Sequence, residues 1–98
     1  MNADTTSVSL EELAQASGLS EAEVRDLVGY GALVPREPEA THWTFSSHST
    51  LTVRTAGRLR SDLDLDLYAV SVCLRYIDRI EALEQQLRHL QAQLPGGR

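Results

Sequence analysis

The chain has 98 residues, 42% of them hydrophobic, and a net charge of −5 from nine arginines and fourteen acidic side chains. This length suits one small domain and leaves no room for a large enzyme with its own cofactor domain. A single cysteine excludes an intrachain disulfide framework, and the three histidines lack the spacing of zinc ligands. The first nine residues lack the basic start and apolar stretch of a signal peptide, and no apolar run is long enough to span a membrane. We therefore expect a cytoplasmic protein without a metal or cofactor.

The charge is distributed unevenly along the chain. Residues 1–40 contain eight acidic and two basic side chains, a net charge of −6, whereas residues 41–98 contain six acidic and seven basic ones, a net charge of +1. An acidic half of this kind repels the phosphates of nucleic acid and favours a basic partner.

Two short helices are predicted near the N-terminus. The first follows Ser9, which can form a capping box with Glu12, and it ends at Gly18, where glycine adopts the left-handed conformation without strain. The second follows Ser20, with Glu23 at the same spacing, and it ends at a pair of glycines. Two capped helices joined by a turn that contains glycine are typical of a helix-turn-helix motif.

Residues 32–46 predict a short β-hairpin, or wing. Leu33 and Val34 are followed by prolines and acids, and then by a β-favouring segment in which Trp43 and Phe45 point to one side. Pro35 restricts the first strand to a sheet edge. Because a two-stranded wing needs a large side chain to hold it on its domain, we expect Trp43 to pack there rather than to cap a bound ligand.

A third helix is predicted to begin at Ser46 or Ser47 and to continue through Gly57, which weakens it without breaking it. After Ser61, residues 62–67 alternate between aspartate and leucine, a pattern that also suits a strand. We interpret them as a helix end and a connector, because Asp66 can cap the next helix.

The last predicted element is a long helix whose apolar residues are alternately four and three residues apart, which keeps them on one seam. The seam consists of Ala69, Cys73, Tyr76, Ile80, Leu83, Leu87, Leu90 and Leu94. A second apolar stripe of Val70, Leu74 and Ile77 occurs only in the first part of the helix. The start of the helix is thus expected to pack on its own domain, with Cys73 as a small hydrophobe. The seam from Tyr76 to Leu94 is expected to pack on a second copy of the chain, as a coiled coil in a homodimer.

These elements predict a mainly helical fold. We expect a winged helix-turn-helix domain with a small β-hairpin over residues 8–66, the long helix over residues 67–94, and flexible tails at residues 1–7 and 95–98. The order of elements resembles the MerR superfamily, in which segment 30–36 stands where the recognition helix joins the wing.

Within that superfamily, the sequence is most similar to the CbpM-type chaperone modulators. The blocks that carry the resemblance, in order, are Gly18-Leu19-Ser20-Glu21, Gly31 with Val34-Pro35-Arg36-Glu37, Trp43-Thr44-Phe45, Arg58-Leu59-Arg60, Leu65-Asp66 and the long terminal helix. The resemblance implies a protein that docks on the J-domain of a CbpA/DnaJ-type co-chaperone, over the basic face that otherwise engages DnaK. It would thereby inhibit both the co-chaperone activity and the DNA association of that partner.

Two acidic surfaces are candidates for recognising this basic face. Our first choice is the connector, with Asp62, Asp64 and Asp66. The rival surface, on the first two helices, comprises Glu11, Glu12, Glu21, Glu23 and Asp26. A simpler interpretation of the connector is that Asp66 is only a helix cap and that the other two aspartates are solvated. The sequence alone does not choose among these interpretations.

The alternative function is that of a MerR-family transcription regulator that binds DNA. Its recognition helix would enter the major groove, but here that helix carries a single base, Arg25, among several acids. Other bases that could touch phosphates, or form a solvated face paired with Asp62 or Glu37, are Arg36, Arg54, Arg58 and Arg60. A third possibility is a scaffold that only dimerises. No nucleophile, base or phosphate-loop arrangement can be assembled, so we do not expect an enzyme.

Overall fold

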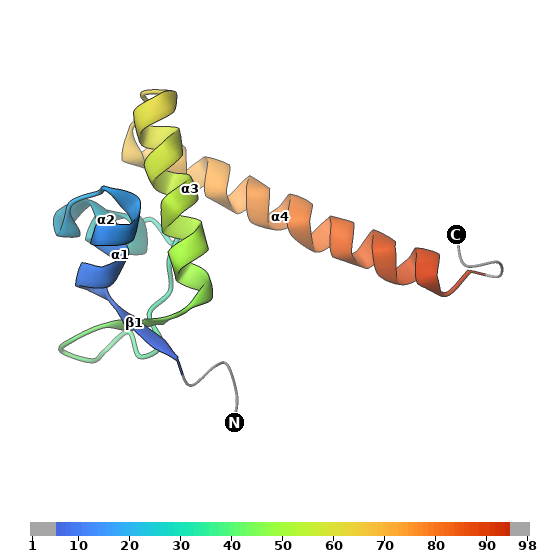
Figure 1. Ribbon diagram of the computed structural model, residues 1–98, viewed down its shortest axis with the longest axis horizontal. Coiled ribbons are helices and arrows are strands. Elements are labelled where there is room, and N and C mark those ends of the chain that lie inside the picture. Colours follow the sequence, from blue (N-terminus) through green and yellow to red (C-terminus); the bar gives the residue numbers. More distant parts are fainter. Residues whose placement is uncertain (1–5, 95–98) are drawn as a thin grey trace.

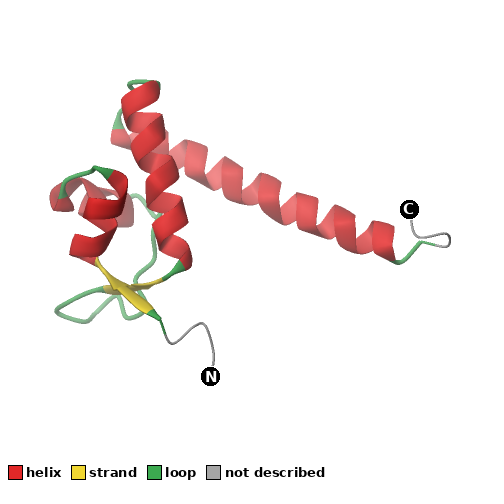
Figure 2. Ribbon diagram, in the orientation of Figure 1, coloured by secondary structure: helices red, strands yellow, loops and turns green. Residues whose placement is uncertain are grey.

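The computed structural model describes residues 6–94. The elements, in chain order, are β1 (Ser7–Ser9), α1 (Leu10–Ser17), α2 (Glu21–Gly29), β2 (Thr44–Ser46), α3 (His48–Asp62) and α4 (Leu67–Ala92). The first five form a small domain, and α4 packs on it with its first turns and then projects well beyond it (Figure 1). Helices dominate and the strands form one two-stranded sheet, as Figure 2 shows, so the predicted mainly helical class is confirmed. Apart from residues 6 and 7, the predicted tails lie outside the described residues.

The two N-terminal helices have the predicted caps. The Ser9 hydroxyl accepts a hydrogen bond from the Glu12 N–H at 3.1 Å, and the Glu12 carboxylate accepts one from the Ser9 N–H at 2.8 Å. Ser20 and Glu23 exchange the same two bonds at 3.0 and 2.9 Å. Gly18 ends α1 in the left-handed conformation, with φ of 77°. Each cap satisfies backbone donors that the first turn of a helix leaves without a partner.

The predicted β-hairpin between residues 32 and 46 is wrong in its strand pairing. β2 pairs antiparallel with β1, with Val8 opposite Phe45, and not with Leu33–Val34. Leu33 is buried in the core, and Pro35 lacks the N–H that a paired strand needs, so this segment enters the domain as a loop. The loop returns to β2 through a hydrogen bond from the Arg36 N–H to the Thr44 carbonyl at 2.8 Å.

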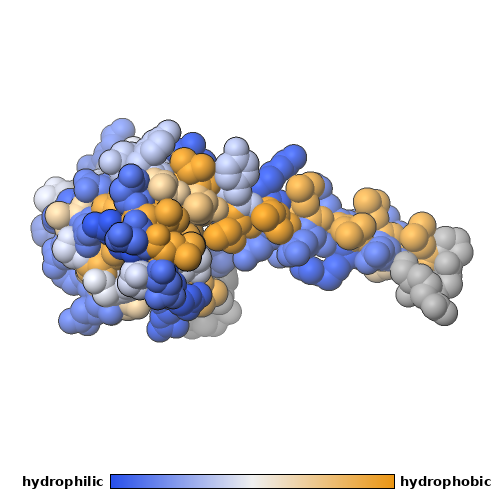
Figure 3. Space-filling view, turned by 90° about the horizontal axis from the view of Figure 1, so that it is seen from above, coloured by the Kyte–Doolittle hydropathy of each residue, from blue (hydrophilic) through white to orange (hydrophobic). Residues whose placement is uncertain are grey.

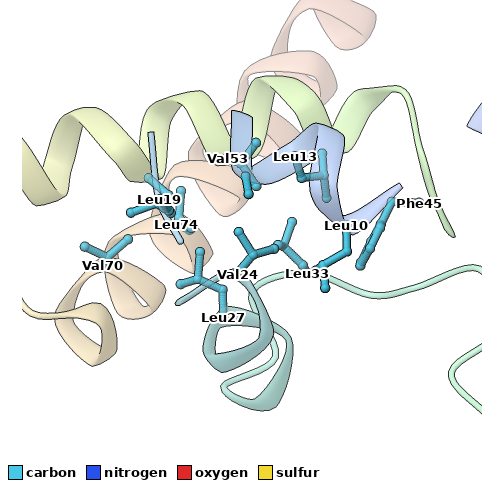
Figure 4. Packing of buried hydrophobic residues seen from close by; sticks show 12 residues of the cluster. Leu10, Leu13, Leu19, Val24, Leu27, Leu33, Phe45, Val53, Val70 and Leu74 are labelled. Carbon is cyan, nitrogen blue, oxygen red and sulfur yellow. The ribbon is translucent and has the colours of Figure 1, made fainter. Parts of the chain in front are cut away.

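The core lies where α1, α2 and α3 meet the first turns of α4, and Figure 4 shows apolar side chains from these elements converging there. Its fully buried hydrophobic members are Leu13, Val24, Leu27, Phe45, Val53, Ala56 and Val70. α1 and α3 approach so closely that a Cβ atom at Gly57 would overlap the carbonyl oxygen of Ser17. Close packing therefore requires glycine at position 57, whereas the sequence alone predicted only that Gly57 weakens the helix.

The long helix α4 has two different environments. Asp66 caps it as predicted, because its carboxylate accepts a hydrogen bond from the Ala69 N–H at 2.8 Å. Val70, Ser71 and Leu74 are buried against the domain, whereas every residue from 78 to 94 is exposed. The helix accounts for much of the longest dimension of the molecule, 50 Å (Figure 1).

Candidate partner-binding surface

Arg60 brings the connector and the first turn of α2 together. Its Nε and Nη2 atoms each lie 3.3 Å from one oxygen of Glu23, and its Nη1 atom donates to the Leu65 carbonyl at 3.0 Å. The connector backbone at Leu65 and the carboxylate of Glu23 on α2 are thus held together by one arginine. Glu11 and Glu12 are at the start of α1, beside β1 and at the opposite end of the domain from the connector (Figure 1).

Several of the predicted acids form hydrogen bonds or helix caps within the chain. Glu23 accepts hydrogen bonds from the Ser20 N–H and from Arg60. The Ser20 hydrogen bond is the main cause that holds the pKa of Glu23 below its ordinary value, with the Arg60 guanidinium contributing, against desolvation, which raises it. Glu12 and Asp66 serve as helix caps. Arg60 thus pairs with Glu23 rather than with Asp62 or Glu37.

The remaining predicted acids are exposed. They are Glu11, Glu21, Asp26, Asp62 and Asp64. Asp62 accepts a hydrogen bond from the Ser61 hydroxyl at 3.3 Å. Asp64 has a left-handed backbone, with φ of 53°, at the point where the chain turns from α3 toward α4. Within residues 6–94 no ion pair engages either Asp62 or Asp64.

Large apolar side chains surround this acidic connector. Leu63 is 62% exposed and Tyr68, in the first turn of α4, is 58% exposed. Tyr30, at the end of α2, is 39% exposed and packs edge to face on Tyr68, with ring centroids 5.5 Å apart. We call Leu63, Tyr68 and Tyr30 the connector platform. The sequence alone did not predict this platform, although the strict alternation of leucine with aspartate indicates that some of those leucines face water.

The predicted seam of α4 is exposed along its whole projecting length. Residues Tyr76, Ile80, Leu83, Leu87, Leu90 and Leu94 are each between 46% and 68% exposed. Figure 3 shows a row of apolar side chains along this part of α4, flanked by hydrophilic ones. No element within residues 6–94 covers the row. Cys73 is a free thiol and is half-buried.

Two of the bases proposed to touch DNA bind groups of the chain itself. Arg25, Arg54 and Arg58 are exposed, but Arg60 pairs with Glu23, and Arg36 donates to the Thr6 carbonyl at 3.1 Å. The recognition helix itself exposes Glu21 and Asp26 beside its one arginine. This surface is poorly suited to a phosphate backbone.

Trp43 has a structural role. Its indole N–H donates to the Pro38 carbonyl at 3.0 Å, and its ring packs edge to face on Phe45 at 6.3 Å. These contacts fold the 36–43 loop back onto the domain, as expected for a side chain that holds a wing. The exposed side of Trp43 borders an open hollow of about 590 Å³, together with Glu11, Arg25 and His42.

The described part of the chain has neither a cluster of metal ligands nor a membrane-spanning helix. Residues 6–94 contain no group of three or more histidine, cysteine or acidic side chains arranged to hold a metal ion. Among the helices in the same range, none has the length and apolar character needed to cross a membrane.

Comparison with known proteins connects this geometry to a family. Residues 8–92 match the family described as "MerR HTH family regulatory protein". Over 90 residues the chain is 37% identical to the "Chaperone modulatory protein CbpM" of Escherichia coli (strain K12 / DH10B), of Escherichia coli O157:H7 (strain EC4115 / EHEC) and of Shigella boydii serotype 18 (strain CDC 3083-94 / BS512). These alignments cover 92% of this chain and 89% of each relative. The chain belongs to the MerR-like CbpM family.

Membership in the CbpM family confirms the resemblance seen in the sequence. In this family member, α1 and α2 form the helix-turn-helix, and the loop that ends in β2 takes the place of the wing. Neither the family description nor the names of the relatives is that of an enzyme.

Proposed function

We propose that this protein is a chaperone modulator that binds the J-domain of a CbpA/DnaJ-type co-chaperone and inhibits its co-chaperone and DNA-binding activities. The observation that carries the proposal is the similarity, over nearly the whole chain, to relatives named chaperone modulatory protein CbpM. The single free cysteine is compatible with action in the cytoplasm, where thiols remain reduced.

The charges of the chain support a basic protein as the partner. Exposed carboxylates on α2 and on the connector would attract a cationic face and speed its association. The same carboxylates would repel nucleic acid, whose affinity for proteins comes largely from contacts between bases and phosphates.

We further propose that the protein acts as a homodimer joined along α4. Burying a leucine side chain contributes about 1.5–3 kcal/mol relative to leaving it in water. The exposed seam offers four leucines and an isoleucine on one face, and a second copy of α4 is the matching surface for a coiled coil. Replacing Leu83 and Leu87 together by lysine should convert a dimer into a monomer in sedimentation equilibrium. Retention of the dimer by this variant would contradict the pairing along the seam.

The function is tested by measuring binding to, and inhibition of, the J-domain co-chaperone from the same organism. Reversing charge at Asp62 and Asp64 should weaken binding at least tenfold at low salt while leaving the dimer intact, because both carboxylates are exposed and form no ion pair within residues 6–94. Glu37→Arg with Glu39→Arg is the matched control, since these acids are equally exposed in the 36–43 loop. Unchanged affinity of the connector variant would move the site to the acids of the first helices.

DNA binding is the competing function, and the match to a family of regulatory proteins favours testing it. An electrophoretic shift assay with palindromic DNA over a range of salt concentrations distinguishes DNA binding from the chaperone-modulator function. Nanomolar binding that weakens steeply with salt would identify a transcription regulator and overturn the chaperone proposal. We expect only weak, nonspecific binding.

A further inference from the structure

The connector platform stands out because its large side chains are exposed while the backbone beneath them is fixed. Arg60 donates to the Leu65 carbonyl at 3.0 Å, and Arg75 donates to the Tyr30 carbonyl at 2.7 Å. Asp66 caps the helix turn that carries Tyr68. The fixed backbone and the contact between the Tyr30 and Tyr68 rings reduce the freedom that is lost on binding, which is the property of a preorganised contact surface.

The type of residue on the platform is also that of a protein interface. Tyrosine is enriched at the centres of interfaces, where a few anchors supply most of the binding energy and polar residues form the rim. Here Tyr68 in the first turn of α4 and Tyr30 at the end of α2 pack edge to face and are exposed, and Leu63 is exposed between Asp62 and Asp64 on the connector that leads to Tyr68.

The charges around the platform favour a cationic protein as its occupant. The two nearby arginines, Arg60 and Arg75, are directed at groups of the chain itself, whereas Asp62 and Asp64 form no ion pair in the described residues. A second copy of the chain would bring like charges together here, since each copy carries a net charge of −5. The projecting part of α4 differs, because it carries both acids and arginines beside the seam.

We propose that Leu63, Tyr68 and Tyr30 are the apolar contact residues of the interface with the basic partner, and that they determine how slowly the complex dissociates. Asp62 and Asp64 then govern the rate of association. This inference rests on the proposed function. It adds uncharged contact residues to the acidic ones already proposed.

The test measures association and dissociation rates with the J-domain co-chaperone for two variants, Leu63→Ala and Tyr68→Ala. Each should raise the dissociation rate by about 10- to 100-fold with little change in the association rate. Tyr68→Phe keeps the ring and should retain most of the affinity. The matched control is Leu51→Ala, because Leu51 on α3 is 58% exposed, close to the 62% of Leu63. Thermal unfolding of each variant confirms that the domain stays folded.

The possible outcomes are distinct. Failure of the wild-type chain to bind any J-domain protein would overturn the proposed function and the inference together. Normal dissociation of the Leu63→Ala and Tyr68→Ala variants, with binding still sensitive to charge reversal at Asp62 and Asp64, would overturn the inference alone. Loss of the dimer in Tyr68→Ala, measured by sedimentation, would assign the platform to a second copy of the chain and would also overturn it.

Discussion

The first turns of α4 and its projecting part carry similar side chains in different surroundings. Val70 and Leu74 are almost completely buried against the domain, whereas Leu83 and Leu87 are 46% and 55% exposed. Both pairs follow the spacing of a single helix face, but the faces are different: one turns toward α3 and the core, the other away from it. The difference teaches that one continuous helix can complete the core of its own domain and also carry an apolar face that the domain leaves exposed.

The strongest test of this contrast replaces a leucine in each part. Leu74→Ala should lower the free energy of unfolding by about 2–5 kcal/mol, because it leaves a cavity in the core. Leu87→Ala should change the stability of the isolated domain by less than about 0.5 kcal/mol, because that side chain already faces water. Urea unfolding at a protein concentration low enough for monomers measures both. Equal losses would show that the projecting part belongs to the cooperative unit of the domain.

A second test compares two glycines within the domain. Gly57→Ala should cost about 1–3 kcal/mol, because the new methyl group would overlap the Ser17 carbonyl and push α1 and α3 apart. Gly29→Ala should be neutral or slightly stabilising, since no atom lies within 4 Å of its Cβ position and alanine favours helix. Thermal unfolding distinguishes them. A Gly57→Ala variant as stable as wild type would mean that the helices separate at no cost.

A third test removes a local cap. Ser20→Ala deletes the hydroxyl that accepts from the Glu23 N–H, and it should lower stability by about 1 kcal/mol. Ser61→Ala is the control, because that hydroxyl only donates to the exposed carboxylate of Asp62. Urea unfolding that fails to separate these two serines would contradict the importance of the capping box for the domain.

The smallest expected effect concerns pH. Since the folded pKa of Glu23 lies below the ordinary value of 4.5, its ionised form stabilises the domain above that pH. This contribution is lost as the pH falls through the lower folded value. Glu23→Gln should therefore be less stable than wild type at neutral pH, and the difference should vanish in more acidic solution. Unfolding measured from pH 7 to pH 3 checks this, and a difference that does not change with pH would contradict it.

The sequence predicted the features that depend on neighbours along the chain. Both capping boxes, the turn at Gly18, the Asp66 cap and the two stripes of α4 all follow from spacings of seven residues or fewer. These rules are local, so a single sequence is enough to apply them.

The features that the sequence did not predict join distant segments. β1 pairs with a strand 37 residues away, as the register of Val8 opposite Phe45 shows. Arg60 binds Glu23, also separated by 37 residues, and Gly57 admits the backbone of Ser17. Each depends on how helices and strands pack, and many pairings satisfy the same local pattern. The connector platform was missed for the same reason, because exposure is decided by the surrounding fold.

The length and stiffness of α4 have a consequence for stoichiometry. A helix of 26 residues extends about 39 Å, with none of the slack of a flexible linker. Two chains joined along this helix would hold their two connector platforms at a fixed separation. A dimeric partner could bind both platforms at once only if the distance between its two binding faces matched the distance between the platforms. The gain in avidity would then depend on this match as much as on the affinity of each single contact.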